Sequence, residues 1–148
     1  MSNVKTARAS WTGNDLEFDA TMGSGFQFKM SSRPGQESGS PMEMLLAGLV
    51  GCTGVDVVSI LQKMRQNIDG VDVEITAARA EDYPMVYTDA ELIYVVRGKN
   101  IDPKAVEKAI ELSEEKYCSA SIMFRRSGVN IKTSYRIEDV AEGVPEKD

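Results

Sequence analysis

Apolar and polar residues alternate with a period of two along residues 4–32. The apolar positions form three groups, and the turns between them carry Gly13-Asn14 and Gly23-Ser24-Gly25. Alternation of this kind places every second side chain on one face of a strand, and such residues favour tight turns. The pattern therefore predicts a meander of three antiparallel strands. Residues 31–39 are polar and rich in Ser and Gly, which is typical of a loop.

A long helix is predicted to begin at Pro41 and to run to about Gln66. Ser40 is a good N-cap, Pro41 suits the first helical position, and Glu43 stands three residues after the serine, as in a capping box. Residues 44–55 are all apolar, Gly or Thr, so we expect this helix to be buried on nearly all sides. That run is too short to cross a bilayer, and a membrane helix is the weaker alternative.

Three glycines, Gly48, Gly51 and Gly54, stand three residues apart on this helix. Each lowers helix propensity by up to about 1 kcal/mol, so close packing against the stripe is expected to offset the loss. A bare apolar helix of this length is more than one chain of 148 residues covers easily. A dimer with a shared core is therefore favoured.

The second half predicts two strands, a helix and a last strand. Residues 67–70 are expected to end the long helix, and strands follow at 71–77 and around 90–96, with a Tyr83-Pro84 turn between them. Asp102-Pro103 opens a helix that ends near Cys118, and the last strand covers 129–137. The predicted order is βββ-α-ββ-α-β, an α+β fold with a mainly antiparallel sheet. We expect one domain over 1–148, with a flexible tail at 139–148.

The composition excludes several kinds of chemistry. The chain has no histidine and two cysteines, Cys52 and Cys118. Without histidine there is no Ser-His-Asp triad or Cys-His pair, and a zinc site is not expected. The net charge of −6 argues against nucleic-acid binding. No secretory signal is visible at the start, so we expect a cytoplasmic protein. In that compartment the cysteines are free thiols or a redox couple, although two ordinary buried cysteines remain the simpler alternative.

The residues around Cys52 and Cys118 resemble a known family. Residues 40–52, Arg33 in the preceding Gly-containing loop, and the distant Cys118 are similar to the OsmC/Ohr family of hydroperoxide-reducing proteins. Residues 40–44, 56–63 and 115–119 are most similar to its YhfA-like branch. The resemblance extends over nearly the whole chain.

The resemblance implies an intertwined homodimer with active sites at the subunit interface. Cys52 would be the peroxidatic cysteine, Cys118 the resolving cysteine, and Arg33 the residue that holds the Cys52 thiolate. The substrate would be a small hydrophobic hydroperoxide, and an external dithiol such as a lipoylated protein would reduce the resulting disulfide. No bound cofactor or metal, no membrane and no nucleic acid are implied.

Three acidic residues bear on this interpretation. Peroxidase members of the family carry a glutamate directly after the helix-starting proline, where this chain has Met42. Glu43 lies on the opposite side of the helix from Cys52 and is better explained as a cap, so Glu37 or a carboxylate of the partner subunit remains the substitute.

Asp56 shares a helical face with Cys52. It is expected to pair with an arginine, for which Arg33, Arg125 and Arg126 are the candidates, or else to form a structural salt bridge or lie on an exposed face. Since Met42 replaces the glutamate, a catalytically weak protein that binds a hydrophobic or thiol-containing small molecule remains the alternative function.

Overall fold

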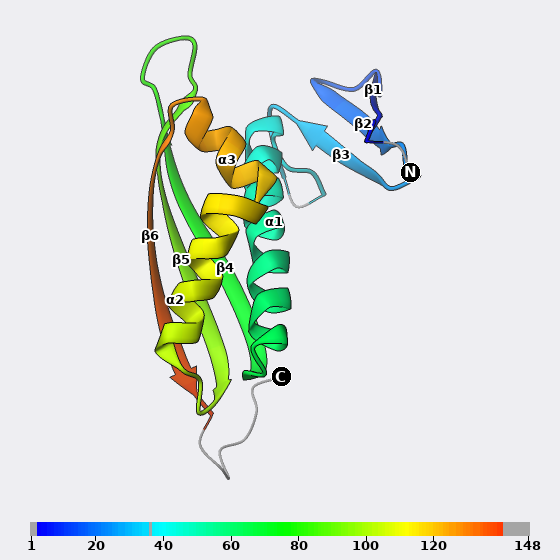
Figure 1. Ribbon diagram of the computed structural model, residues 1–148. Helices are drawn as coiled ribbons and strands as arrows, with labels where there is room; N and C mark the ends of the chain where they lie inside the picture. Colours follow the sequence, from blue (N-terminus) through cyan, green and yellow to red (C-terminus); the bar gives the residue numbers. More distant parts are fainter. Residues whose placement is uncertain (1–2, 36, 141–148) are drawn as a thin grey trace. The chain divides into compact units, whose positions relative to one another are not determined.

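A computed structural model describes residues 3–35 and 37–140, and its chain divides into two compact units (Figure 1). The N-terminal unit covers Met1–Ala47 and the C-terminal unit covers Gly48–Asp148. Helix α1 (Pro41–Lys63) begins in the first unit and continues into the second. The expected tail at 139–148 lies outside the described residues from 141 onward.

The N-terminal unit contains the predicted meander. Strands β1 (Ala7–Trp11), β2 (Glu17–Met22) and β3 (Gln27–Ser31) pair antiparallel in the order β1-β2-β3. Gly13 and Gly25 stand in the two turns with φ of 86° and 95°, in the left-handed region that glycine adopts without a steric penalty. The period of two and these turn residues account for this sheet.

Helix α1 begins with the predicted capping box. The Ser40 backbone N–H donates to Glu43 Oε1 at 2.8 Å, and the Glu43 N–H donates to Ser40 Oγ at 3.1 Å. The helix ends at Lys63, slightly earlier than expected, and the chain turns at Arg65 with a φ of 59°. The expectation that residues 67–70 only end the helix is wrong, because the next strand already begins at Asn67.

The C-terminal unit contains a second, mixed sheet. Strand β4 (Asn67–Arg79) pairs antiparallel with β5 (Tyr87–Lys99), and β6 (Asn130–Asp139) pairs parallel with β5. The α+β class and the mainly antiparallel pairing are confirmed, but the described residues form two sheets of three strands where one sheet was expected. The helices between β5 and β6 provide the long crossover that a parallel pair needs.

The predicted order also lacks one helix. Helix α2 (Pro103–Leu112) starts at Asp102 as predicted, and its last residues run into a π-helical turn, η1 (Ser113–Tyr117). Helix α3 (Ser119–Arg126) follows immediately, where the sequence predicted no element. The Cys118 side chain caps α3 by accepting the Ser121 backbone N–H at 3.3 Å. This use of a thiol as a cap explains why capping rules did not find α3.

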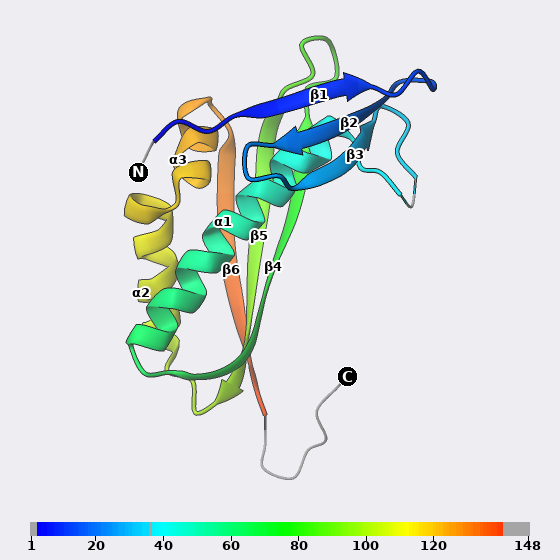
Figure 2. The same ribbon diagram turned by 90° about the vertical axis from the view of Figure 1, so that its right-hand side faces the viewer.

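In the C-terminal unit, α1 and α2 cover the same face of the mixed sheet (Figures 1 and 2). The core between them is built around the central strand β5. Its fully buried members include Val57 and Leu61 from α1, Leu92, Tyr94 and Val96 from β5, and Val106 and Ala109 from α2.

The expectation that α1 is buried on nearly all sides is wrong for the single chain. Its buried residues, Leu49, Thr53, Val57 and Leu61, form one narrow stripe, whereas Val55 is 70% exposed. Among the described residues, Gly54 approaches Val73, but Gly51 has open space around it. By length and composition alone α1 is also apolar enough to cross a membrane, a test that the core helix of a soluble protein passes too. The helix thus presents an apolar face that its own chain leaves uncovered.

Candidate functional site

The C-terminal unit brings Cys52 and Cys118 together. Cys52 lies in the middle of α1 and is half-buried, and Cys118 is fully buried between η1 and α3. Both are free thiols, and Cys52 lies close enough to Cys118 to help raise the pKa of the Cys118 thiol. Two cysteines far apart in the sequence therefore form one site, with one sulfur more accessible than the other.

The surroundings of Cys118 favour its protonated form. Burial, the largest effect, raises the pKa of the Cys118 thiol to about 11, and the nearby Cys52 acts in the same direction. The backbone N–H of Ser121 donates to Cys118 Sγ and partly opposes this rise. Cys118 therefore keeps its proton at neutral pH and can donate it in a hydrogen bond to the Cys52 sulfur.

A chain of buried hydroxyl groups lies beside the two thiols. Thr53 follows Cys52 on α1, and its Oγ1 is 2.6 Å from Tyr94 Oη and 2.9 Å from Ser113 Oγ. The Ser113 hydroxyl donates to Asp56 Oδ2 at 3.2 Å. This chain joins α1, the central strand β5 and the π-helical turn, so it connects every element around the cysteine pair except α3.

The direction of these hydrogen bonds follows from the proton count. A hydroxyl has one proton, so Ser113, which donates to Asp56, must accept from Thr53, and Thr53 must accept from Tyr94. Burial raises the pKa of Tyr94 to about 12, so its hydroxyl keeps the proton that it donates. The protons are thus ordered toward the Asp56 carboxylate.

Asp56 is bound differently from the expectation. Its carboxylate accepts from Ser113, whereas the Arg125 guanidinium lies 3.4 Å from Glu114 and also donates to the Ile131 carbonyl oxygen. Of the alternatives for Asp56, the pairing with Arg125 is not found, and a hydroxyl contact takes its place because the π-helical turn directs Ser113 toward α1. Arg126 is exposed.

The other three candidate residues belong to the N-terminal unit. The Arg33 side chain is 74% exposed, and its guanidinium lies 3.4 Å from the Asp15 carboxylate. The backbone N–H of Arg33 donates to Ser31 Oγ. Glu43 serves as the cap, and hydrogen bonds from Ser40 lower the pKa of its carboxyl. Glu37 is exposed. The roles of Arg33 and Glu37 at the thiols remain predictions.

Thr53, Tyr94 and Ser113 were not found from the sequence. Hydroxyl residues are common in helices and strands. The one signal in the sequence is that Thr53 directly follows Cys52 and that Ser113 lies shortly before Cys118. Ser121 was missed as well, and its buried hydroxyl is without a hydrogen-bond partner among the described residues. These residues become visible only when the tertiary contacts are known.

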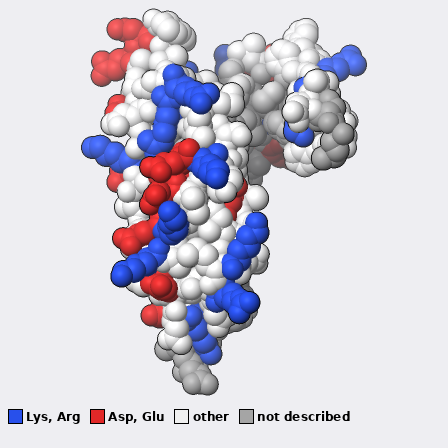
Figure 3. Space-filling model, viewed as in Figure 1, with Lys and Arg blue, Asp and Glu red and all other residues white. Residues whose placement is uncertain are grey.

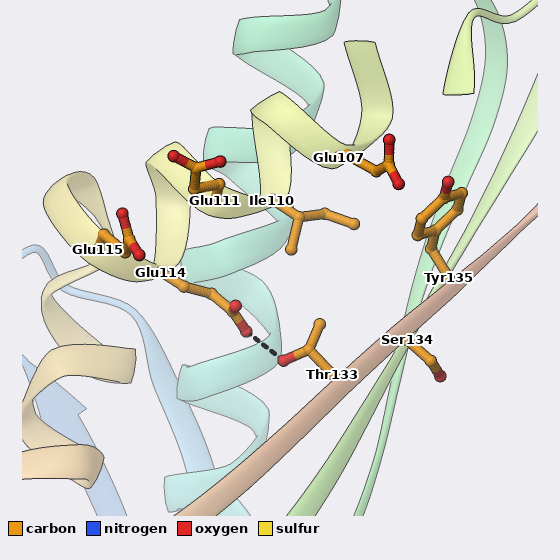
Figure 4. A pocket seen from close by; sticks show the side chains of 8 residues that line it. All are labelled: Glu107, Ile110, Glu111, Glu114, Glu115, Thr133, Ser134 and Tyr135. Carbon is orange, nitrogen blue, oxygen red and sulfur yellow. Dashed lines mark hydrogen bonds between the residues drawn. The ribbon is translucent and has the colours of Figure 1, made fainter. Parts of the chain in front are cut away.

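An acidic pocket, distinct from the thiol pair, is lined by residues of α2, η1 and β6 (Figure 4). Four glutamates of α2 and η1 line it together with residues of β6: Glu107, Glu111, Glu114, Glu115, Ile110, Thr133, Ser134 and Tyr135. The Thr133 hydroxyl donates to the Glu114 carboxylate. Consecutive residues of η1 therefore reach opposite sides, with Ser113 bonded to α1 and Glu114 to β6.

Surface charge and metal ligands add little to the site. Acidic and basic side chains are interspersed over the face of the C-terminal unit seen in Figure 3. Within residues 3–35 and 37–140, no group of three or more Cys, Asp or Glu side chains could hold a metal ion.

Comparison with known proteins agrees with this fold. The OsmC-like protein family model matches residues 34–134, and the chain belongs to this family. Protein YhfA of Escherichia coli strain K12 is 40% identical over 131 residues, which cover 88% of this chain and 96% of that protein.

Solved structures extend the similarity. A hypothetical protein from Aquifex aeolicus VF5 is 31% identical with a TM-score of 0.84, covering 95% of this chain and 100% of the other. An OsmC-like protein from Mycoplasma pneumoniae is 17% identical with a TM-score of 0.79, covering 93% and 99%, and shows the shared fold alone. Family membership supports a redox or peroxide-related role.

Proposed function

We propose that this protein is a thiol-dependent peroxidase that reduces organic hydroperoxides to alcohols. The observation that carries the proposal is the contact between Cys52 and Cys118, which pairs a more accessible thiol with a buried one. Proteins of the same fold from Legionella pneumophila and Bacillus subtilis bear the name organic hydroperoxide resistance protein. Their low identity makes the name a guide to the class of substrate only.

The proposed reaction begins at Cys52. Its thiolate attacks one oxygen of the hydroperoxide, the O–O bond breaks, and the leaving alkoxide takes a proton to become an alcohol. Cys52 is then a sulfenic acid. Cys118 condenses with it, so that the S–S bond forms, the S–O bond breaks and water leaves with the thiol proton of Cys118. An external dithiol reduces the disulfide and restores both thiols.

Arg33 is the proposed activator of the Cys52 thiolate. A guanidinium is always charged, and a nearby positive charge favours a thiolate over a thiol. Its ion pair with Asp15 is largely exposed to solvent, so that it costs little free energy to exchange Asp15 for another anion. The Cys118 thiol would provide a second, neutral donor to the same sulfur.

The proposal includes a homodimer in the cytoplasm. The exposed Val55 and the open space at Gly51 leave an apolar face on α1 that a second copy of this chain would cover. A covering subunit would also exclude water from the half-buried Cys52. A lipoylated protein or another dithiol is the proposed reductant.

The second candidate is a binding protein with weak catalysis. Met42 favours a binding protein, because peroxidase members of the family have a glutamate at this position. The neighbouring Glu43 does not replace that glutamate, since its carboxylate is bonded to Ser40 as the helix cap. Such a protein would bind a hydrophobic or thiol-containing small molecule and leave the O–O bond intact.

A turnover assay distinguishes the two candidates. Reduced protein is mixed with cumene hydroperoxide and dihydrolipoamide, and peroxide loss is followed alongside the Cys52→Ser variant. A peroxidase consumes many equivalents of peroxide, and the variant consumes none above the background. If wild-type protein and the variant match the background equally, the proposed activity is wrong.

A further inference from the structure

Ser113 is hydrogen-bonded both to Cys118 and to the helix that carries Cys52. Its carbonyl oxygen accepts the Cys118 backbone N–H at 2.7 Å, and its hydroxyl bonds to Thr53 and Asp56 on α1. Thr53 directly follows Cys52, and Asp56 lies one helical turn further along. Ser113 is thus a short bridge between the backbone of one cysteine and the helix that carries the other.

The bridge depends on the π-helical turn. The hydrogen bond from Cys118 to Ser113 spans five residues, which is the spacing of a π-helix. This turn ends at Cys118, whose φ of −80° and ψ of 98° are extended, and α3 begins directly afterwards. The backbone of Cys118 is therefore held from one side by Ser113, while its sulfur is held from the other side by the Ser121 N–H.

All three hydroxyl groups of the bridge are inaccessible to solvent. Ser113, Thr53 and Tyr94 are each 0% exposed. A buried hydroxyl or acceptor that loses its hydrogen-bond partner is unfavourable, so the chain of hydroxyl groups resists sliding of η1 along α1. A disulfide tolerates only a narrow range of Cα separations, about 4.4–6.8 Å, so its formation is sensitive to such sliding.

We propose that Ser113 is a positioning residue that holds Cys118 in register with Cys52 for disulfide formation. Ser113 touches no reacting atom and acts through the Cys118 backbone and the α1 residues next to Cys52. The kinetic effect of Ser113 rests on the proposed function, because the step that Ser113 serves is the condensation of Cys118 with the Cys52 sulfenic acid. The earlier attack of Cys52 on the peroxide forms no bond to Cys118, so we expect it to depend on Ser113 much less than the condensation does.

The test separates the two steps in Ser113→Ala. In a Cys118→Ser background, dimedone trapping measures the rate at which Cys52 becomes a sulfenic acid in cumene hydroperoxide. With both cysteines present, loss of two hydrogens in the intact mass measures the rate of disulfide formation. We expect the first rate to change by less than about threefold and the second to fall at least about tenfold, since misplaced reacting groups lose that much or more.

Control variants separate positioning from general destabilisation. Ser59→Ala removes a half-buried hydroxyl from α1 outside the bridge and should leave both rates unchanged. Ser113→Thr keeps the hydroxyl and should restore much of the second rate. Thr53→Val removes the α1 end of the same hydrogen bond with a side chain of equal shape, and it should reproduce the selective loss even if Ser113→Ala does not fold.

A second measurement needs no peroxidase activity. Equilibrium exchange between the protein and a dithiothreitol redox couple gives the effective concentration of the two thiols, which should fall at least about tenfold in Ser113→Ala or Thr53→Val. If wild-type protein does not react with hydroperoxide, the proposed function fails, and this equilibrium still decides the role of Ser113. An unchanged effective concentration, or equal loss of both rates in folded variants, overturns the proposal.

Discussion

The Cys118 thiol is fully buried and lies beside the half-buried Cys52, so the two cysteines form an unequal pair. Burial makes Cys118 a poor anion and a good hydrogen-bond donor, whereas Cys52 retains contact with solvent. Under the proposed function, we therefore expect a peroxide that approaches from solvent to react at Cys52.

This inequality predicts how stability depends on alkaline pH. The pKa of Cys118 is about 11 in the folded protein against 9.0 for an ordinary cysteine, so the folded state binds more protons between these values. The free energy of unfolding should therefore fall as the pH rises from about 9 to about 11, by on the order of 2–3 kcal/mol. Urea unfolding of the reduced protein across this range measures it.

Cys118→Ser is the matched control for this prediction. It removes the titrating thiol, so the decrease between pH 9 and 11 should become much smaller. Tyr94, with a pKa of about 12, contributes a loss of the same sign that begins at higher pH and remains in the variant. An identical pH profile in both proteins would contradict the assignment.

The capping box predicts separate effects on stability and chemistry. Ser40→Ala should lower the free energy of unfolding by about 1 kcal/mol, because the Glu43 N–H loses its partner. Glu43→Gln should destabilise in the same direction near neutral pH. Because hydrogen bonding lowers the pKa of Glu43, that difference should disappear as the pH falls through this pKa.

Neither cap variant should change the rate of Cys52 oxidation by more than about twofold. Stopped-flow measurement with a hydroperoxide checks this point. A large loss of rate in Glu43→Gln, without a comparable loss in Ser40→Ala, would instead identify Glu43 as part of the catalytic site.

The uncovered face of α1 predicts self-association. Val55→Asp should raise the dissociation constant of the dimer at least about tenfold, because a carboxylate would be buried without a partner. Val86→Asp, at another exposed valine between β4 and β5, is the control and should have little effect. Sedimentation equilibrium tests both. A monomeric wild-type protein at high concentration would contradict the proposed homodimer.

Met42 predicts a gain of function. If the missing glutamate limits catalysis, Met42→Glu should raise kcat/KM for an organic hydroperoxide, by about tenfold or more if the carboxylate orients Arg33. The same substitution combined with Arg33→Lys should lose that gain, since Lys lacks the planar guanidinium. No change in kcat/KM would favour the binding protein over the peroxidase.

Local patterns were sufficient for the elements that depend on local interactions. The meander follows from alternation and turn glycines, and the start of α1 follows from Ser40 and Glu43, which contact one another across three residues. The resemblance to the OsmC/Ohr family was confirmed by the family match over residues 34–134.

Features that depend on distant contacts could not be predicted in this way. The parallel pairing of β6 with β5 and the hydroxyl chain from Tyr94 to Asp56 join residues far apart in the sequence. Helix α3 was missed because its cap is a cysteine thiol. The apolar run in α1 predicted burial and, because one chain does not easily cover such a helix, a dimer; much of the run is exposed in the single chain.

The central claim is that Cys52 and Cys118 form a redox pair driven by hydroperoxide. It is tested most directly by treating the reduced protein with one equivalent of cumene hydroperoxide, followed by intact mass measurement and peptide mapping without reduction. We predict a loss of two hydrogens, located in a single Cys52–Cys118 disulfide and absent in Cys52→Ser. Two free thiols that persist in excess peroxide would contradict it.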